Sequence, residues 1–173
     1  MQHRPEAVEA LLEVETFKGD IWENCAGQGH ISETLKKYGY NVISTDLIDR
    51  GYCAGGSDFF QYDKTLAPNI VTNPPYKYGL EWVEHSLKLL PQGGKLALLL
   101  PIHFLESKKR KKMFLSTPPK YIYIFTNRIY CAKNGEFYTY NEKGRKIKKS
   151  SAMGYAWYVW VKGDYQYPQV IHL

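Results

Sequence analysis

Apolar residues in this chain of 173 residues fall in short runs that alternate with segments of helical spacing. The runs at 21–22, 41–45, 70–72, 95–100, 121–125 and 156–161 are typical of buried strands. Helical spacing is found at 5–17, 31–38, 80–90 and 107–115. This alternation predicts an α/β fold, with a largely parallel sheet covered by helices on both faces. After the last run, the tail to Leu173 contains Pro168 and is expected to be loose.

A glycine turn joins the first predicted strand to the following helix. It reads Glu23-Asn24-Cys25-Ala26-Gly27-Gln28-Gly29, and the second strand ends at Asp46, where a carboxylate commonly accepts hydrogen bonds from ribose hydroxyls. The glycine pair lets backbone approach a ligand closely. Ser32 occupies the position of a third glycine, which argues against a dinucleotide site. Because a carboxylate repels pyrophosphate, Glu23 favours a ligand with a cationic amino-acid end, such as S-adenosylmethionine.

Each of these acids also has a simpler interpretation. Glu23 can serve as an anion at a helix N-terminus, and Asp46 can serve as a capping residue. Residues 49–63 form a glycine-rich loop in which Asp58 and Phe59 could bind an adenine. The alternative for that pair is a turn aspartate beside core phenylalanines, and the sequence slightly favours it.

The apolar run at 70–72 ends in the tetrad Asn73-Pro74-Pro75-Tyr76. The prolines lock φ and end the strand, and a residue before a proline is held extended. The Asn73 amide oxygen and the Pro74 carbonyl could each accept a hydrogen bond from a planar amino group, which would make its nitrogen more nucleophilic. Tyr76 could stack on the ring that carries the amino group. The alternative is a simple strand end, like the second Pro-Pro pair at 117–120, which lacks Asn and an aromatic residue.

A net charge of +6 and a pI near 9.1 favour polyanionic partners. Basic residues cluster at 108–112 and at 143–149, the second within a polar segment at 127–151. We expect this segment to be an insertion loop that contacts the substrate, although either cluster could be solvated surface. The candidate substrate-binding residues are Tyr138, Lys143, Arg145, Lys146, Lys148 and Lys149.

Three cysteines, far apart and without a C-x-x-C pair, argue against disulfides and a zinc site. Neither a signal peptide nor an apolar run long enough to span a membrane is seen. We therefore expect a single cytoplasmic domain over residues 1–173, without a metal or a membrane partner.

In this order, the glycine turn, Asp46, Asp58-Phe59-Phe60 and the tetrad resemble the S-adenosylmethionine-dependent adenine-N6 DNA methyltransferases, including short phage-type members. The resemblance implies a Rossmann-like class I fold with a mostly parallel seven-stranded sheet and one antiparallel strand. It implies that Asn73, Pro74, Pro75 and Tyr76 hold an adenine flipped out of its stack. The cofactor-binding residues that it implies are Glu23, Asn24, Cys25, Ala26, Gly27, Gly29, Asp46, Leu47, Asp58, Phe59 and Asn73.

Similar tetrads occur in RNA methyltransferases and in enzymes that methylate a glutamine amide of release factors. The basic charge favours nucleic acid over protein, but the residues do not distinguish DNA from RNA. No segment is large enough for a separate target-recognition domain, which indicates weak sequence specificity or a specificity partner protein. A catalytically silent nucleic-acid-binding subunit is disfavoured because the tetrad and glycine turn are intact. A nicotinamide-dependent oxidoreductase is disfavoured by Ser32 and Glu23.

Overall fold

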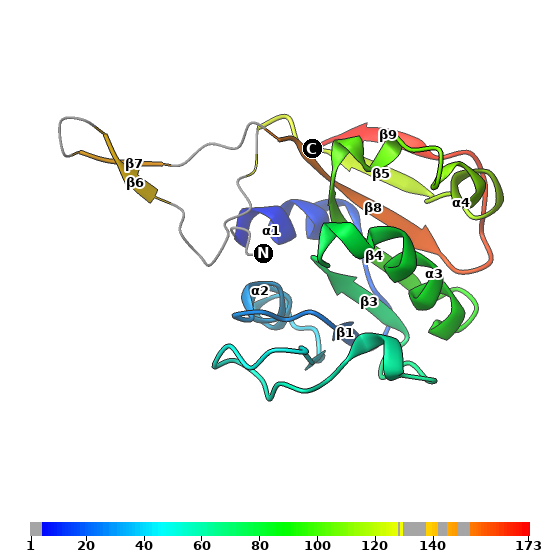
Figure 1. Ribbon diagram of the computed structural model, residues 1–173, viewed down its shortest axis with the longest axis horizontal. Coiled ribbons are helices and arrows are strands. Elements are labelled where there is room, and N and C mark those ends of the chain that lie inside the picture. The colour runs from blue at the N-terminus through cyan, green and yellow to red at the C-terminus, as the bar shows by residue number, and fades with distance from the viewer. Residues whose placement is uncertain (1–4, 128, 130–137, 142–144, 149–152) are drawn as a thin grey trace.

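The computed structural model describes residues 5–127, 129, 138–141, 145–148 and 153–173, so Lys143 and Lys149 lie outside the described residues. A seven-stranded sheet has the order β2-β1-β3-β4-β8-β5-β9 (Figure 1). Only β8 is antiparallel to its neighbours in this sheet, as the family resemblance implies. The strands are β1 Ile21–Glu23, β2 Val42–Ser44, β3 Asn69–Thr72, β4 Lys95–Pro101, β5 Tyr121–Ile124, β8 Tyr155–Val161 and β9 Gln169–His172.

Helices cover both faces of the sheet, which is why its central strands are apolar on both sides. The helices α1 (Pro5–Val14) and α2 (His30–Lys37) pack on one face, and α3 (Gly79–Leu89) and α4 (Lys111–Ser116) pack on the other. Strand β8 shows the alternation, because Trp157 packs toward α1 whereas Tyr158 packs toward α3. The Trp157 indole donates to the Ala7 carbonyl at 2.7 Å, which fixes α1 on the sheet.

Two predictions about the C-terminal half were wrong. The helix expected from residue 107 begins only at Lys111, because the Arg110 side chain turns back and donates to the carbonyls of Phe104 (2.5 Å) and Glu106 (2.9 Å). The basic cluster at 108–112 is therefore split between a turn and a helix. The tail is also not loose, since β9 pairs in parallel with β5 and the Leu173 amide donates to the Ile124 carbonyl at 2.9 Å.

Part of the 127–151 segment forms a small antiparallel ribbon. Strand β6 (Tyr138–Tyr140) pairs with β7 (Lys146–Lys148), and Figure 1 shows the ribbon standing away from the main sheet. Within the described residues, no helix combines the length and apolar character needed to span a membrane.

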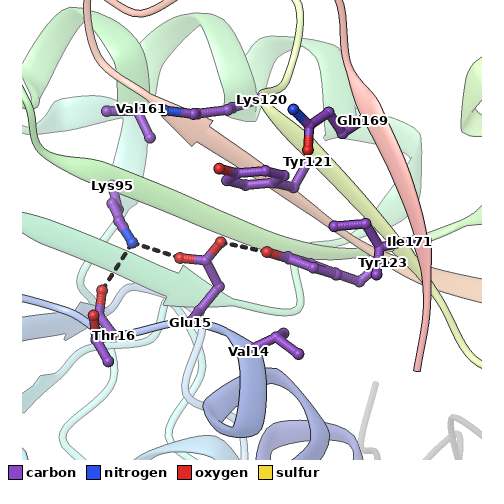
Figure 2. Close-up of a pocket in the computed structure, with 10 residues that line it drawn as sticks. All are labelled: Val14, Glu15, Thr16, Lys95, Lys120, Tyr121, Tyr123, Val161, Gln169 and Ile171. Carbon is purple, nitrogen blue, oxygen red and sulfur yellow. Dashed lines mark hydrogen bonds and ion pairs between the residues drawn. The ribbon is translucent and has the colours of Figure 1, made fainter.

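A cavity of about 540 Å³ lies at the edge where the parallel strands β4, β5 and β9 begin (Figure 2). The buried Glu15 carboxylate lies between Lys95, at 2.5 Å, and the Tyr123 hydroxyl, at 2.6 Å. Burial and this hydrogen bond both raise the pKa of Tyr123, so the hydroxyl stays protonated and donates. These contacts join the end of α1 to β4 and β5, and they satisfy both oxygens of a carboxylate that is otherwise costly to bury.

Tyr123→Phe should lower the free energy of unfolding by about 1–3 kcal/mol, because it removes one donor from a buried carboxylate. Tyr121→Phe is a matched control, since its ring stacks on Tyr123 at 5.6 Å but its hydroxyl bonds to none of the described residues. Urea unfolding of the two variants measures the difference. Equal losses would show that the hydroxyl contact with Glu15 contributes nothing.

Candidate functional site

The motifs selected from the sequence meet at one edge of the sheet. Strands β1, β2 and β3 are parallel and adjacent, so the segments that follow Glu23, Ser44 and Thr72 emerge side by side. The chain passes from β1 to β2 on one side and then crosses to β3 on the other. This reversal creates a switch point between β1 and β3, where open α/β sheets commonly bind ligands.

A pocket of about 410 Å³ opens at this switch point. Eight of the predicted site residues line it: Asn24, Cys25, Gly27, Asp46, Leu47, Asp58, Phe59 and Pro75. Its lining does not include the predicted residues Glu23, Ala26, Gly29, Asn73, Pro74 and Tyr76. The pocket is also lined by residues that were not predicted as site residues: Ile48, Arg50, Ser57, Phe60, Tyr78 and Trp82. Ile48 and Phe60 directly follow predicted site residues and Ser57 directly precedes one, so adjacency in sequence was the available signal for these three.

The Asp46 carboxylate organises the glycine turn. One oxygen accepts from the Gly27 amide at 2.7 Å and the other from the Ile48 amide at 2.9 Å. Gly27 has a φ of +59°, and a Cβ there would meet no atom within 4 Å, so its backbone faces open space. Asp46 therefore caps backbone amides, as its simpler interpretation proposes. The space beside Gly27 stays open to a ligand.

Gly29 has a different role from Gly27. A Cβ at Gly29 would lie 2.3 Å from the ring of Tyr52, so this glycine makes room for the side chain of a neighbouring loop. The Tyr52 hydroxyl donates to Glu33 at 2.6 Å and accepts from Lys36 at 2.9 Å. These bonds hold the loop after β2 against α2.

Glu23 is buried behind the turn. Its carboxylate accepts from the Ser32 amide at 2.8 Å and from the Ser32 hydroxyl, near the first turn of α2. Burial raises the pKa of Glu23 to about 8, although the two Ser32 hydrogen bonds act in the opposite direction. Glu23 therefore contacts the first turn of α2, where the helix-anion interpretation expects it, but its raised pKa makes the carboxyl largely protonated and uncharged at neutral pH.

An aromatic wall forms one side of the pocket. The Phe59 ring is buried and stacks on Trp82 at 4.6 Å, and Phe60, which is 37% exposed, lies 5.2 Å from Trp82. The Trp82 indole donates to the Asn24 amide oxygen at 3.0 Å, which ties this wall to the end of β1. Asp58 accepts from the Phe60 amide at 3.0 Å and so caps the short 3-10 helix at Phe59–Gln61.

The tetrad follows β3 directly beside the pocket. Asn73 and Pro74 are buried, whereas Pro75 is exposed and forms part of the pocket wall. The Pro74 carbonyl accepts no hydrogen bond from the described residues, while the Pro75 carbonyl accepts from the Tyr78 amide at 2.9 Å. The Tyr76 ring packs 5.7 Å from Tyr155 of β8, so it is braced against the sheet.

Of the predicted substrate residues, Tyr138, Lys146 and Lys148 belong to the β6–β7 ribbon, and Arg145 directly precedes β7. Arg145 and Lys146 are exposed. The register pairs Tyr138 with Lys148 and Tyr140 with Lys146, and Tyr140 is exposed like its partner. Among the described residues, no group of three or more His, Cys, Asp and Glu side chains could hold a metal ion.

Solved structures share this architecture at low sequence identity. A Listeria monocytogenes protein classed among the class I S-adenosylmethionine-dependent methyltransferases has a TM-score of 0.57 and 13% identity over 97% of this chain and 62% of its own. An S-adenosylmethionine-dependent O-methyltransferase of Thermotoga maritima has a TM-score of 0.55 and 14% identity, over 93% and 66%. The chain has the Rossmann-like class I methyltransferase fold.

This fold also occurs in much larger proteins. The type IIG restriction endonuclease BpuSI has a TM-score of 0.54 and 13% identity over 94% of this chain but only 24% of its own. The chain thus spans less than two thirds of the length of each of these three structures. No protein-family model matches the sequence, and a search of curated proteins finds no relative.

The raised pKa of Glu23 predicts a pH-dependent stability. Its pKa is about 8 when folded against an ordinary value of 4.5, so the folded state binds the proton more tightly. Protonation of Glu23 contributes fully to the free energy of unfolding below pH 4.5. This contribution is lost as pH rises toward 8, at up to about 1.4 kcal/mol per pH unit. Urea unfolding between pH 5 and 8 should show this loss in the wild type but not in Glu23→Gln. Glu33→Gln, which alters an exposed carboxylate, should keep the wild-type slope, and identical slopes in all three proteins would contradict the assignment.

Proposed function

We propose that this protein transfers a methyl group from S-adenosylmethionine to the exocyclic N6 amino group of adenine in DNA. The observation that carries the proposal is the position of the tetrad: Asn73 follows β3 directly, and Pro75 forms part of the wall of the switch-point pocket. An amino group held by the tetrad would therefore lie beside whatever occupies the pocket. Methyl transfer requires this adjacency, because donor and acceptor must be held in line and in contact.

The residues around the pocket fit S-adenosylmethionine. Gly27 leaves backbone exposed to open space, and the buried Asn24 Nδ2 group has no hydrogen-bond partner among the described residues, so a donor is available to a ligand. Phe60, which is 37% exposed, presents an apolar ring to a flat base, and the second oxygen of Asp58 accepts no hydrogen bond from the described residues and so can accept from the amino group of that base. In the proposed complex the glycine turn holds the methionine part, Asp46 and Leu47 the ribose, and Asp58 to Phe60 the adenine.

The bound cofactor supplies a methyl group activated by its positively charged sulfur. The residues of the chain position and activate the amino group that receives the methyl group. The Asn73 amide oxygen and the Pro74 carbonyl accept the two N–H groups of adenine N6, which directs the nitrogen lone pair toward the methyl group. Tyr76, braced by Tyr155, stacks on the flipped base and keeps it in this orientation.

Nucleic acid is the favoured substrate class because the chain carries a net charge of +6 and a basic ribbon. Tyr140 and Lys146 are paired across the β6–β7 ribbon and both are exposed, which suits contact with a base and a phosphate together. The resemblance of the glycine turn and the tetrad to the adenine-N6 DNA methyltransferases favours DNA over RNA.

Asn73→Ala should reduce methyl transfer by at least about 100-fold, because it removes one of the two acceptors that prepare the amino group. The affinity for S-adenosylmethionine should change little. The assay is nucleoside mass spectrometry after incubation with single-stranded DNA, duplex DNA and RNA in separate reactions, with calorimetry for the cofactor.

Asn69→Ala is the matched control for this experiment. Asn69 is a buried asparagine at the other end of β3, and its amide donates to the Lys18 and Asp20 carbonyls, so its loss should affect stability more than turnover. Methylated adenine found only in the RNA reaction would support the proposed mechanism but would show that the substrate is RNA and not DNA. Wild-type activity in Asn73→Ala would overturn the mechanism.

Replacing Arg145 and Lys146 with alanine should weaken DNA binding in a salt-dependent way. The slope of log affinity against log salt should fall by about 0.9 for each phosphate that the variant no longer neutralises. Fluorescence anisotropy across a salt series measures this slope. Alanine at the exposed Lys64 and Lys88 removes the same charge elsewhere and should leave the slope unchanged. An unchanged slope in the Arg145 and Lys146 variant would exclude the ribbon from the DNA interface.

A further inference from the structure

Arg50 is a cation at the wall of the cofactor pocket whose role no motif explains. Among the residues lining this pocket, all in the described part of the chain, it is the only one with a positively charged side chain. Its guanidinium forms neither an ion pair nor a hydrogen bond with the described residues. This contrasts with Arg110, whose guanidinium is occupied by backbone carbonyls.

The loop that carries Arg50 is braced on both sides of this residue. The Asp49 carboxylate accepts from the Gly51 amide at 2.8 Å, closing a tight turn with Arg50 at its centre. Gly55 comes so close to Asp49 that a Cβ would lie 2.4 Å from its amide nitrogen. Two residues after Arg50, Tyr52 packs on Gly29 and bonds to Glu33 of α2. The backbone of Arg50 is therefore held in place before any ligand arrives.

Arg50 lies toward the glycine-turn end of the pocket. Arg50 lines the same pocket as Cys25 and Gly27 of the glycine turn, and Tyr52, two residues further along its loop, packs on Gly29. The same loop reaches Asp58 and the aromatic wall only further along the chain, after Gly55 and Gly56. The pocket thus offers a cation near the turn and a carboxylate, Asp58, near the aromatic wall.

We infer that Arg50 binds the carboxylate of the amino-acid end of S-adenosylmethionine and selects for ligands that carry this group. The inference rests on the proposed function. A guanidinium suits this task, because it can donate two parallel hydrogen bonds to one carboxylate. Among the described residues no carboxylate forms an ion pair with Arg50, so its guanidinium is available to the ligand.

The test compares two ligands that differ only in the carboxylate: S-adenosylmethionine and decarboxylated S-adenosylmethionine. Calorimetry of the full chain should show that Arg50→Ala weakens S-adenosylmethionine binding by about 10- to 100-fold, as expected for loss of a charge-assisted hydrogen-bonded pair. The decarboxylated ligand should bind as before or slightly more tightly, because it carries more positive charge and loses a repulsive cation. Lys64→Ala, which removes an exposed cation outside the pocket, should preserve the wild-type ratio of the two affinities.

Three results would overturn the inference. The first is an Arg50→Ala variant whose affinities for both ligands and for DNA equal those of the wild type. The second is equal weakening of both ligands, which would mean that Arg50 shapes the pocket without recognising the carboxylate. The third is unchanged cofactor affinity with weaker DNA binding, which would assign Arg50 to a backbone phosphate. Failure of the wild type to bind either ligand would instead overturn the proposed function, and the inference with it.

Discussion

Parallel pairing of β1 with both β2 and β3 is the constraint on which the candidate site depends. Because the three strands run in the same direction, the glycine turn, the Asp46 loop and the tetrad must all leave the sheet at one edge. The Asp46 carboxylate then links two of these segments through the Gly27 and Ile48 amides. Residues from three distant parts of the sequence are thereby held around one pocket.

The sequence predicted six of the seven strands of the main sheet, because each has a local signal. Strand β4 is a continuous apolar run, Asp46 ends a strand, and two prolines must end β3. The fold class follows from the same alternation of elements. Adjacency of the motifs also followed, since the carboxyl ends of neighbouring parallel strands always share an edge.

Features that depend on contacts between distant segments were not predictable in this way. The space at Gly29 is used by Tyr52, and a glycine in a turn looks the same in sequence whether a ligand or a side chain fills that space. Trp82 has the spacing of an ordinary core residue of α3, yet it also lines the pocket. Strand β9 is short and follows Pro168, so its order comes from pairing with β5 and not from its own sequence.

The reversed strand β8 has a consequence for how the chain folds. It lies between β4 and β5, so these two strands, which are close in sequence, do not pair with each other. Their open edges stay exposed until a segment synthesised much later inserts between them. A sheet completed by such a distant segment has high contact order, which slows folding and leaves unpaired apolar strands open to other chains. During synthesis this protein therefore depends on its last strands for protection from aggregation.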